Sequence, residues 1–544
     1  MLSTPPLSTR QSRQSDRAPA VLPPPRPQKE PGFVSDQLEL QTRPLPPLAP
    51  DFQTHLPTLA RPPNAPLFEP GSVLRDLPGD LTPVKALAHI NRLRNQAQRG
   101  VDTSREDFFH YSALSHDNSL KLYTDREYFT DGLFPAIDRA TDSIHLAFLT
   151  IDGGQVAQYV TDKLIAKKEN HPNIEIRILT DGLGASAIFP WSKASRNIRR
   201  LRRAGIPVVV NNVLFDGLEH RKLLVVDGKE AYSGGTCLGD PYFGNRAFWR
   251  TFNQIPANKR DTARDALFDR TLPPPFEITP ELELPEFHDY GIRYTGSSVA
   301  DLQAAFMQSW LQHGQTLNPD LTNEAFAKRY FPHPDPIPEN EATTLKMVHS
   351  APAGESQFRQ SALAVIDGAT QTLDINFTYI LIPEFLERVE AAAARGVKVR
   401  MLMPGKEGID LEICWWITRS YYPQLSRAGD VEFYEFNTYT HCKFLVADKR
   451  LVFASTGNPE WQSWEWACDS SVLIDSPAFA AEVETTIFDK DMGADRAILV
   501  PEQEIHSPRW WEKVIQFFSN LINWIFQSPR LPRHPRRKLI SPLS

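Results

Sequence analysis

Two regions of the chain alternate apolar, strand-like runs with patterns of helical period. Short runs rich in Ile, Leu and Val predict buried strands, and apolar residues three or four positions apart predict the helices that cover them. In the first region these elements are the strand Ser143–Thr150, a helix near Val156–Lys168, the strand Ile174–Thr180, a helix that ends near Arg203 before Gly205, and the strand Val208–Val210. Strands and helices alternate throughout, so the pattern predicts an α/β fold.

The second region repeats this order of elements. Its helices and strands are predicted at Ala362–Gly368, Thr372–Tyr379, Pro383–Arg395 and Val397–Met403. Upstream of both regions, apolar residues from Val84 to Leu93 also follow a helical spacing. Solenoid repeats recur about every 20 to 50 residues, and the two regions lie much further apart than that. The long repeat therefore indicates two copies of a whole α/β domain, each with its own sheet.

Composition sets the expected domain boundaries. Residues 1–83 are rich in proline and poor in aromatic residues, which predicts a disordered arm because such a segment buries too little apolar surface to fold. We assign residues 84–315 to the first domain and 344–500 to the second. The segment 316–343, rich in Pro, Asn and acidic residues, is expected to be a linker, and 501–544 a separate C-terminal segment.

One polar motif occurs once in each region. The sequence from His220 to Asp227 reads HRKLLVVD, and the sequence from His441 to Asp448 reads HCKFLVAD. Each residue of the second motif lies 221 positions after its equivalent in the first. A single His-x-Lys pattern is most often an ordinary exposed strand, but two copies with matched spacing indicate a duplicated catalytic half-site.

The histidine and lysine of each motif are the residues expected to react. Residues two apart share a face of a strand, so His220 is expected beside Lys222 and His441 beside Lys443. An ammonium group attracts an anion, and an imidazole can attack that anion or move a proton. Because two cations make a poor site for a divalent metal, we expect no metal and no other cofactor.

The aspartates of the motifs have a different predicted role. Asp227 and Asp448 lie an odd number of positions after their histidines, so on a regular strand they point to the opposite face. We expect both to fix the ends of the strands, with Asp227-Gly228 in a tight turn.

Charge and cysteine content narrow the class of protein. The formal net charge is −7, which argues against a nucleic-acid partner because such a partner requires a broad basic surface. The four cysteines show no CxxC spacing, so a disulfide framework or a zinc site is not expected. No apolar run approaches the length of about 18 residues that a spanning helix needs, and no secretory signal is evident. We therefore expect a cytoplasmic protein.

A turn of small residues follows each motif at the same distance, at Gly234–Cys237 and at Ser455–Asn458. Small residues let backbone N–H groups approach an oxyanion, and an asparagine adds an amide donor. With these turns the chain resembles the phospholipase D superfamily, whose repeated mark is an H-x-K-x4-D motif followed by such a turn. The first motif, Gly239-Asp240 and Trp249-Arg250 are similar to the bacterial cardiolipin synthase branch.

The resemblance implies a fold and a reaction. The fold would be two phospholipase D-like α/β-sandwich domains, packed with pseudo-twofold symmetry around one active site at their interface. One histidine would attack a phospholipid phosphodiester to form a phosphohistidine while the other protonates the leaving alkoxide. Transfer to an alcohol, or hydrolysis to phosphatidic acid, would follow. His220 is expected to be the nucleophile and His441 the acid, because the family usually attacks with the N-terminal copy.

The residues expected to bind the substrate phosphate come from both copies. They are Lys222, Lys443, Asn458, Thr456 and Gly235. Lysine ammonium groups, an amide and the N–H groups of a small-residue turn are the donors that can hold phosphoryl oxygens as negative charge builds on them.

In the second copy, the acid that would set the tautomer of the histidine follows from the resemblance. The stretch Asn458–Ser463, followed by Asp469, is similar to the family's N-x-D-x-R-S stretch and its later carboxylate, although Gln462 replaces the usual arginine. The resemblance implies that Asp469 orients His441.

The first copy departs from the family pattern at two places. Thr251 stands where an acid normally follows Trp-Arg, and a stretch that fits the expected continuation begins only at Asp289. We therefore expect an insertion at about 251–288 and Asp289 as the partner of His220. Cys237 replaces the usual asparagine of the turn, which weakens one phosphate donor and leaves the thiol either packed or open to oxidation.

The C-terminal segment has a composition of its own. The stretch Trp510–Phe526 is dense in aromatic residues and is followed by Arg530, Arg533, Arg536, Arg537 and Lys538. It is too short to span a bilayer but has the character of an interfacial anchor. The alternative is a terminal helix packed on the core, with a solvated basic tail. We expect residues 510–538 to contact a membrane surface peripherally.

Two further functions stay open from the sequence alone. One is a nuclease of the same superfamily, although such nucleases commonly carry one motif per chain and pair as dimers. The other is a degenerate membrane-binding scaffold, which the substitution at Cys237 and the proline-rich arm would suit. Two complete motifs in one chain favour an enzyme, and because one chain carries both half-sites, a monomer could be active.

Overall fold

The computed structural model describes residues 114–182, 193–211, 218–270, 275–279, 282, 284–313, 323–350, 357–465, 467–506 and 510–527. The arm predicted at 1–83 and the helix predicted from Val84 to Leu93 lie outside the described residues.

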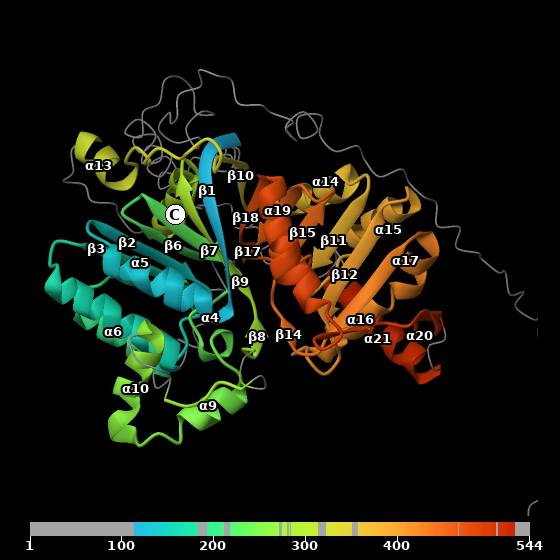
Figure 1. Ribbon diagram of the computed structural model, residues 1–544, viewed down its shortest axis with the longest axis horizontal. Coiled ribbons are helices and arrows are strands. Elements are labelled where there is room, and N and C mark those ends of the chain that lie inside the picture. Colours follow the sequence, from blue (N-terminus) through green and yellow to red (C-terminus); the bar gives the residue numbers. More distant parts are fainter. Residues whose placement is uncertain are drawn as a thin grey trace, which may run out of the picture. The chain divides into compact units, whose positions relative to one another are not determined.

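Seven strands of the first half and eight of the second form one continuous sheet (Figure 1). The strands of the first half are β1 (Leu114–Thr124), β2 (Ser143–Phe148), β3 (Glu175–Asp181), β4 (Val208–Asn211), β6 (Lys222–Val226), β7 (Glu230–Gly234) and β9 (Tyr290–Gly296). Those of the second half are β10 (Thr343–His349), β11 (Thr372–Asn376), β12 (Lys398–Pro404), β13 (Val431–Phe436), β15 (Phe444–Ala447), β16 (Leu451–Ser455), β18 (Ser470–Asp475) and β19 (Ala497–Leu499).

The strand order confirms the duplication. It runs β4-β3-β2-β6-β7-β9-β1 in the first half and β13-β12-β11-β15-β16-β18-β10 in the second, with β19 added beyond β13. The two half-sheets were predicted as separate, and they are instead joined where β1 pairs antiparallel with β10, as in Ser115 opposite Leu345. Pairing these two strands gives partners to backbone groups that would otherwise lie at two open edges.

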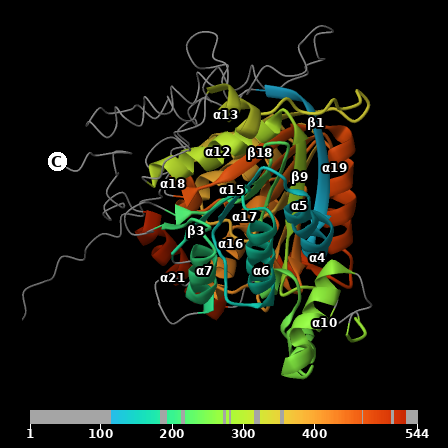
Figure 2. The ribbon, with the colours of Figure 1, turned by 90° about the vertical axis from the view of Figure 1, so that its left-hand side faces the viewer.

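Helices cover both faces of this sheet (Figures 1 and 2). One face packs against α12 (Ser298–Gln312), α19 (Pro477–Val483) and η4 (Glu484–Asp489). The other packs against α5 (Phe134–Arg139), α6 (Gln155–Asn170) and α7 (Lys193–Arg203) in the first half, and α14 (Gln357–Gly368), α15 (Pro383–Ala394) and α17 (Tyr422–Ala428) in the second. The predicted α/β-sandwich architecture is confirmed, and so are the predicted helices that correspond to α6, α7, α14 and α15.

The strands that follow the two histidines explain why both faces need helices. Leu223 and Val225 of β6 face the core under α12, whereas Leu224 and Val226 face the core under α5 and α6. Strand β15 alternates in the same way. A strand that is apolar on both sides must be covered on both sides, and this fixes each motif at the centre of its half-sheet.

Two segments predicted to be linker or insertion carry secondary structure. Helix α13 (Asn323–Tyr330) lies within the expected linker, and its Tyr330 is buried and donates a hydrogen bond to Glu175 at 2.6 Å. Within the expected insertion, α10 (Ala257–Asp269) follows α9 (Arg246–Phe252), and Phe268 of α10 packs on the rings of the first-half core.

The second half also contains α16 (Glu412–Arg419), α18 (Trp461–Glu465), α20 (Glu502–His506) and α21 (Trp510–Gln527). The first half also contains the short helical segments α4 (Asp125–Glu127), η2 (Tyr128–Leu133) and η3 (Asp240–Tyr242). Among the residues that the structure describes, no helix combines the length and the apolar character needed to cross a bilayer.

Candidate active site

Two short parallel strand pairs bring the motifs together, and each pair joins the two halves. Strand β5 (Leu218–Glu219) pairs with β17 (Ala467–Cys468), and β14 (Tyr439–Thr440) pairs with β8 (Phe287–His288). The next residue of each pair continues the contact, because the His220 N–H donates to the Cys468 carbonyl at 3.0 Å and the His441 N–H donates to the His288 carbonyl at 2.7 Å. Each motif histidine therefore lies beside a strand of the other half.

This arrangement crosses the acids between the halves. His220 Nδ1 lies 2.7 Å from Asp469 Oδ1, and His441 Nδ1 lies 2.7 Å from Asp289 Oδ2. The sequence-based prediction selected both acids correctly but paired them wrongly, since it assigned Asp469 to His441 and Asp289 to His220. The strand pairs explain the error, because each acid follows the short strand that runs beside the other half's histidine.

The two acids occupy equivalent positions in the duplicated fold. Asp289 directly precedes β9 and Asp469 directly precedes β18, and these strands correspond in the sheet order. Asp289 lies 69 residues after His220, whereas Asp469 lies 28 residues after His441. The extra residues of the first copy, which contain α10, account for the unequal spacing.

The small-residue turns support the acids. The Thr456 hydroxyl, predicted to bind phosphate, donates to Asp469 Oδ1 at 2.7 Å. A Cβ atom at Gly235 would lie 2.0 Å from Asp289 Oδ1, so this position has room only for glycine. Both residues thus act on the orientation of a carboxylate. Asn458 is buried, and its side-chain oxygen has no hydrogen-bond partner among the described residues.

Both lysines of the motifs are buried at the site. Lys222 donates to the His220 carbonyl at 2.7 Å, and Lys443 donates to the His441 carbonyl at 2.6 Å. Burial lowers the pKa of both ammonium groups, and that of Lys443 is about 8 because burial and repulsion by Lys222 together outweigh the attraction of Asp289. The two cations therefore lie close enough to act on each other, and one anionic group can be stabilised by both.

The two His–Asp pairs differ in how tightly they hold a proton. Burial lowers the pKa of His220 to about 4, and its partner Asp469 has a pKa of about 2 because His220 and Lys222 outweigh the effect of burial. In the other pair, burial raises the pKa of Asp289 to about 8 and lowers that of His441. Burial thus favours the neutral forms of Asp289 and His441, whereas Asp469 is held in its ionised form beside His220.

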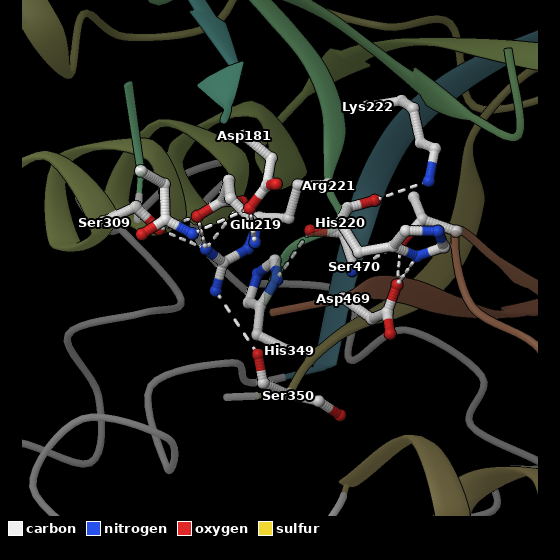
Figure 3. Close-up of polar contacts among 12 residues, drawn as sticks. Asp181, Glu219, His220, Arg221, Lys222, Ser309, His349, Ser350, Asp469 and Ser470 are labelled. Atoms are coloured by element: carbon white, nitrogen blue, oxygen red, sulfur yellow. Dashed lines mark hydrogen bonds and ion pairs between the residues drawn. The ribbon is translucent and has the colours of Figure 1, made fainter. Parts of the chain in front are cut away.

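A buried ion network lies behind His220 (Figure 3). Arg221 and Glu219, both 1% exposed, form an ion pair at 3.4 Å, and the Ser309 hydroxyl from α12 donates to Glu219 at 3.0 Å. Arg221 also donates to the Ser350 carbonyl at 3.4 Å. The neighbours of His220 on both sides are therefore fixed, which holds the imidazole against Asp469.

A second buried ion network ties the two halves together behind His441. His288 Nδ1 lies 2.8 Å from Asp125 of the first half, and His288 Nε2 lies 2.7 Å from Asp491 of the second half. Asp491 also pairs with Arg496 at 3.3 Å. The two carboxylates raise the pKa of His288 to about 10, although burial opposes them. This imidazolium is adjacent to Asp289, so it also fixes the acid that serves His441.

We expect His288→Gln to destabilise the protein by about 3–5 kcal/mol, because it removes the buried cation between Asp125 and Asp491 and leaves only Arg496 to neutralise the buried Asp491. Since the folded pKa lies above the usual value of 6.5, the contribution of His288 is complete below pH 6.5 and disappears as the pH rises through about 10. Urea unfolding at several pH values measures it. His171→Gln, at an exposed histidine after α6, is the matched control. Equal stability of both variants would contradict this role.

Aromatic rings surround His441. The rings of Tyr242, Phe287 and Tyr439 have centroids 5.7, 6.0 and 5.9 Å from the imidazole. His220 has no such ring contact among the described residues, so the two half-sites are unequal. Sequence reasoning missed all three rings, because only Tyr439 lies close to a motif in the chain.

Cys237, the residue that departs from the family pattern, is fully buried. Burial raises the pKa of its thiol, and its sulfur meets the Tyr242 hydroxyl. A protonated, enclosed thiol is a packing residue rather than a reactive one.

The motif aspartates act as predicted, away from the reacting groups. Asp227 accepts hydrogen bonds from the backbone N–H groups of Thr141, Asp142 and Ser143, where β2 begins. Asp448 accepts from the equivalent N–H groups at residues 370–372, before β11. Each aspartate fixes the start of the strand that pairs with its own motif strand.

Comparisons with known proteins agree with this duplicated site. A family model described as the phospholipase D-like domain of cardiolipin synthase matches residues 133–246 and again residues 362–492. A cardiolipin synthase of Staphylococcus aureus is 24% identical over 388 residues, which cover 69% of this chain and 68% of that protein. A cardiolipin synthase of Clostridium perfringens is 25% identical over 427 residues, covering 76% of this chain and 78% of that protein.

A solved structure shares the fold. The crystal structure of phosphatidylserine synthase from Haemophilus influenzae matches with a TM-score of 0.54 at 14% identity, covering 75% of this chain and 93% of that one. The family match in both halves coincides with the two half-sheets and with the two motifs. The chain therefore belongs to the phospholipase D superfamily, as an enzyme similar to the cardiolipin synthases.

Proposed function

We propose that the chain transfers the phosphatidyl group of a phospholipid to an alcohol through a phosphohistidine. The observation that carries the proposal is the pair of His–Asp contacts, crossed between the halves, with two buried lysines between them. The names of its relatives supply the substrate class, since they are cardiolipin synthases.

In the first step, the free Nε2 lone pair of His220 attacks phosphorus. The N–P bond forms, the bond from phosphorus to the head-group oxygen breaks, and that oxygen takes a proton from His441. Lys222 and Lys443 stabilise the charge on the phosphoryl oxygens. In the second step, an alcohol gives its proton to His441, its oxygen bonds to phosphorus, and the N–P bond to His220 breaks. With water in place of the alcohol, the product is phosphatidic acid.

The proton content of the two pairs favours this assignment of roles. His220 donates its Nδ1 proton to an ionised Asp469, which leaves Nε2 free to attack. The Asp289–His441 pair holds the additional proton that the leaving group needs. The assignment thus agrees with the one that the family resemblance implied.

The rate should depend on pH in a bell-shaped manner. We expect kcat/KM to rise as the pH increases through about 4, where His220 loses its proton, and to fall above about 8. The alkaline fall reflects loss of the proton held by the Asp289–His441 pair, with Lys443 titrating in the same range. A soluble short-chain phospholipid measured from pH 4 to 10 provides the test, and a rate that still increases above pH 9 would contradict it.

The function is tested with purified protein and phosphatidylglycerol vesicles in the presence of EDTA. Mass spectrometry should detect cardiolipin together with free glycerol, or phosphatidic acid when hydrolysis dominates. Absence of all these products, with folding confirmed by circular dichroism, would overturn the proposal. Digestion of DNA under the same conditions would instead favour the nuclease alternative.

Helix α21 is the proposed membrane contact. Its Trp510, Phe517 and Phe518 are 77%, 65% and 56% exposed. The helix packs against α16, which begins next to Leu411, another exposed apolar residue. A helix held on the protein by one side and covered with aromatic residues on the other suits the boundary between head groups and acyl chains. The predicted basic residues 530–538 lie outside the described residues.

We expect Phe517→Glu with Phe518→Glu to reduce binding to anionic vesicles at least tenfold, because two charges would enter the apolar boundary. Activity on a soluble short-chain substrate should change much less than activity on vesicles. Ile498→Glu, at an exposed apolar residue of β19, is the control. Vesicle sedimentation measures binding, and equal binding by the double variant and wild type would count against α21 as the contact.

A further inference from the structure

Three hydrogen-bonded side chains lie beside His441, a fourth lies close enough for its charge to act on one of them, and the mechanism above does not use any of the four. Tyr379, Asp410, Tyr439 and Glu460 are called the Tyr379 cluster here. The Tyr379 hydroxyl donates to Asp410 and lies 2.8 Å from the Tyr439 hydroxyl. The negative charge of Glu460 acts on Tyr439, as does that of Asp410.

The cluster adjoins both the reacting groups and the surface. The Tyr439 ring stacks against His441 at 5.9 Å between centroids, and Glu460 is close enough to Lys443 and Lys222 for their charges to act on it. Asp410 is exposed. The cluster therefore extends from the proton-transferring histidine to solvent, on the side where α16 begins.

We propose that the Tyr379 cluster binds the free hydroxyl groups of a polyol acceptor, such as the glycerol head group of a second phospholipid, and so selects which alcohol receives the phosphatidyl group. The inference rests on the proposed function. The acceptor must place one hydroxyl at His441, which removes its proton, so neighbouring hydroxyls of the same molecule would reach the groups around that histidine.

The site presents hydrogen-bond acceptors, which suits a ligand that donates several O–H hydrogen bonds. Asp410 and Glu460 present carboxylate oxygens, which accept hydrogen bonds. The buried side-chain oxygen of Asn458 has no partner among the described residues, while the Asn458 amide bonds Glu460. A buried acceptor without a donor is costly, and a bound hydroxyl would supply that donor.

A quaternary ammonium group fits less well. Aromatic cages for such cations present open ring faces. Here the Phe287 and Tyr439 rings pack on each other with centroids 4.5 Å apart, and both stack on His441. The site also contains two buried lysines, which would repel a third cation. The ring faces are therefore covered by other rings, and a ligand would contact the hydroxyl and carboxylate groups instead.

The test measures partition of the phosphoenzyme between water and added alcohols. Vesicles of phosphatidyl-p-nitrophenol serve as donor, and glycerol, 1-propanol, ethanolamine and choline compete with water. For Asp410→Asn and Tyr379→Phe, we expect the ratio of transfer to hydrolysis to fall at least tenfold with glycerol and less than twofold with 1-propanol. Glu407→Gln removes an equal charge from the same loop and should leave every ratio unchanged.

The other possible outcomes would contradict either the polyol site or the proposed function. Loss with ethanolamine or choline that exceeds the loss with glycerol would replace the polyol site by a cation site. An equal loss with glycerol and 1-propanol would mean that the cluster only supports the fold. If wild-type protein releases no nitrophenol at all, the proposed function fails, and that result is distinct from an unchanged partition ratio in an active enzyme.

Discussion

Alanine at His220 is expected to abolish the phosphoenzyme and to lower turnover by at least about 10⁴-fold, because the attacking atom is gone. Alanine at His441 should have a different effect that depends on the leaving group. With phosphatidylglycerol the loss should be about 10²–10⁴-fold, since the alkoxide leaves without a proton. With phosphatidyl-p-nitrophenol the first step needs no acid, so one equivalent of nitrophenol per site should still appear as a burst.

Rapid mixing and acid quenching separate these roles. In His441→Ala the phosphatidyl group should stay on the protein, because the second step lacks its base, and peptide mapping should place it on His220. A burst in His220→Ala with none in His441→Ala would reverse the assignment. Loss of the burst in both variants would mean that the two histidines do not divide the roles in this way.

The crossed acids make the second large prediction. Asp469→Asn should slow the same step as a substitution of His220, and Asp289→Asn should slow the same step as a substitution of His441. We expect Asp469→Asn to lower the nitrophenol burst rate by about 10³-fold, because the imidazole loses the carboxylate that fixes its tautomer. Asp289→Asn should leave that burst largely intact while slowing turnover of phosphatidylglycerol by a comparable factor.

A double-mutant cycle tests the pairing directly. Adding Asp469→Asn to His220→Ala should cause little further loss, since the acid acts only through that histidine. Adding Asp469→Asn to His441→Ala should multiply the two losses. If the acids served the histidine of their own half, these two results would exchange. Circular dichroism of each variant confirms that the fold is retained.

Much of the fold follows from local pattern. The strands β2, β3, β11 and β12 and the helices between them lie within a few residues of their predicted positions, because apolar period and glycine caps are local signals. The junction between β1 and β10 carries no such signal. It depends on how two complete half-sheets meet, and no alternation within either strand reveals that.

The site likewise contains residues that the sequence reveals and contacts that only tertiary packing reveals. His220, Lys222, His441 and Lys443 were accessible from the repeated motif, and Asp289 and Asp469 from the family resemblance. The pairing of the acids was not, because it depends on which short strands lie side by side. The Tyr379 cluster was missed as well, since Tyr379 and Asp410 are separated from the motif along the chain and meet it only through tertiary packing.

The crossed strand pairs also limit how the two copies can diverge. Asp289 reaches His441 only because β8 runs beside β14. An insertion in the first copy is therefore tolerated only if the chain after it still forms β8 and keeps the register of β8 with β14. Residues 251–286, which include α10, satisfy this condition, since they leave after Trp249-Arg250 and return at Phe287. The two halves can thus differ in length and in side functions, but neither can evolve a new active-site strand without a matching change in the other.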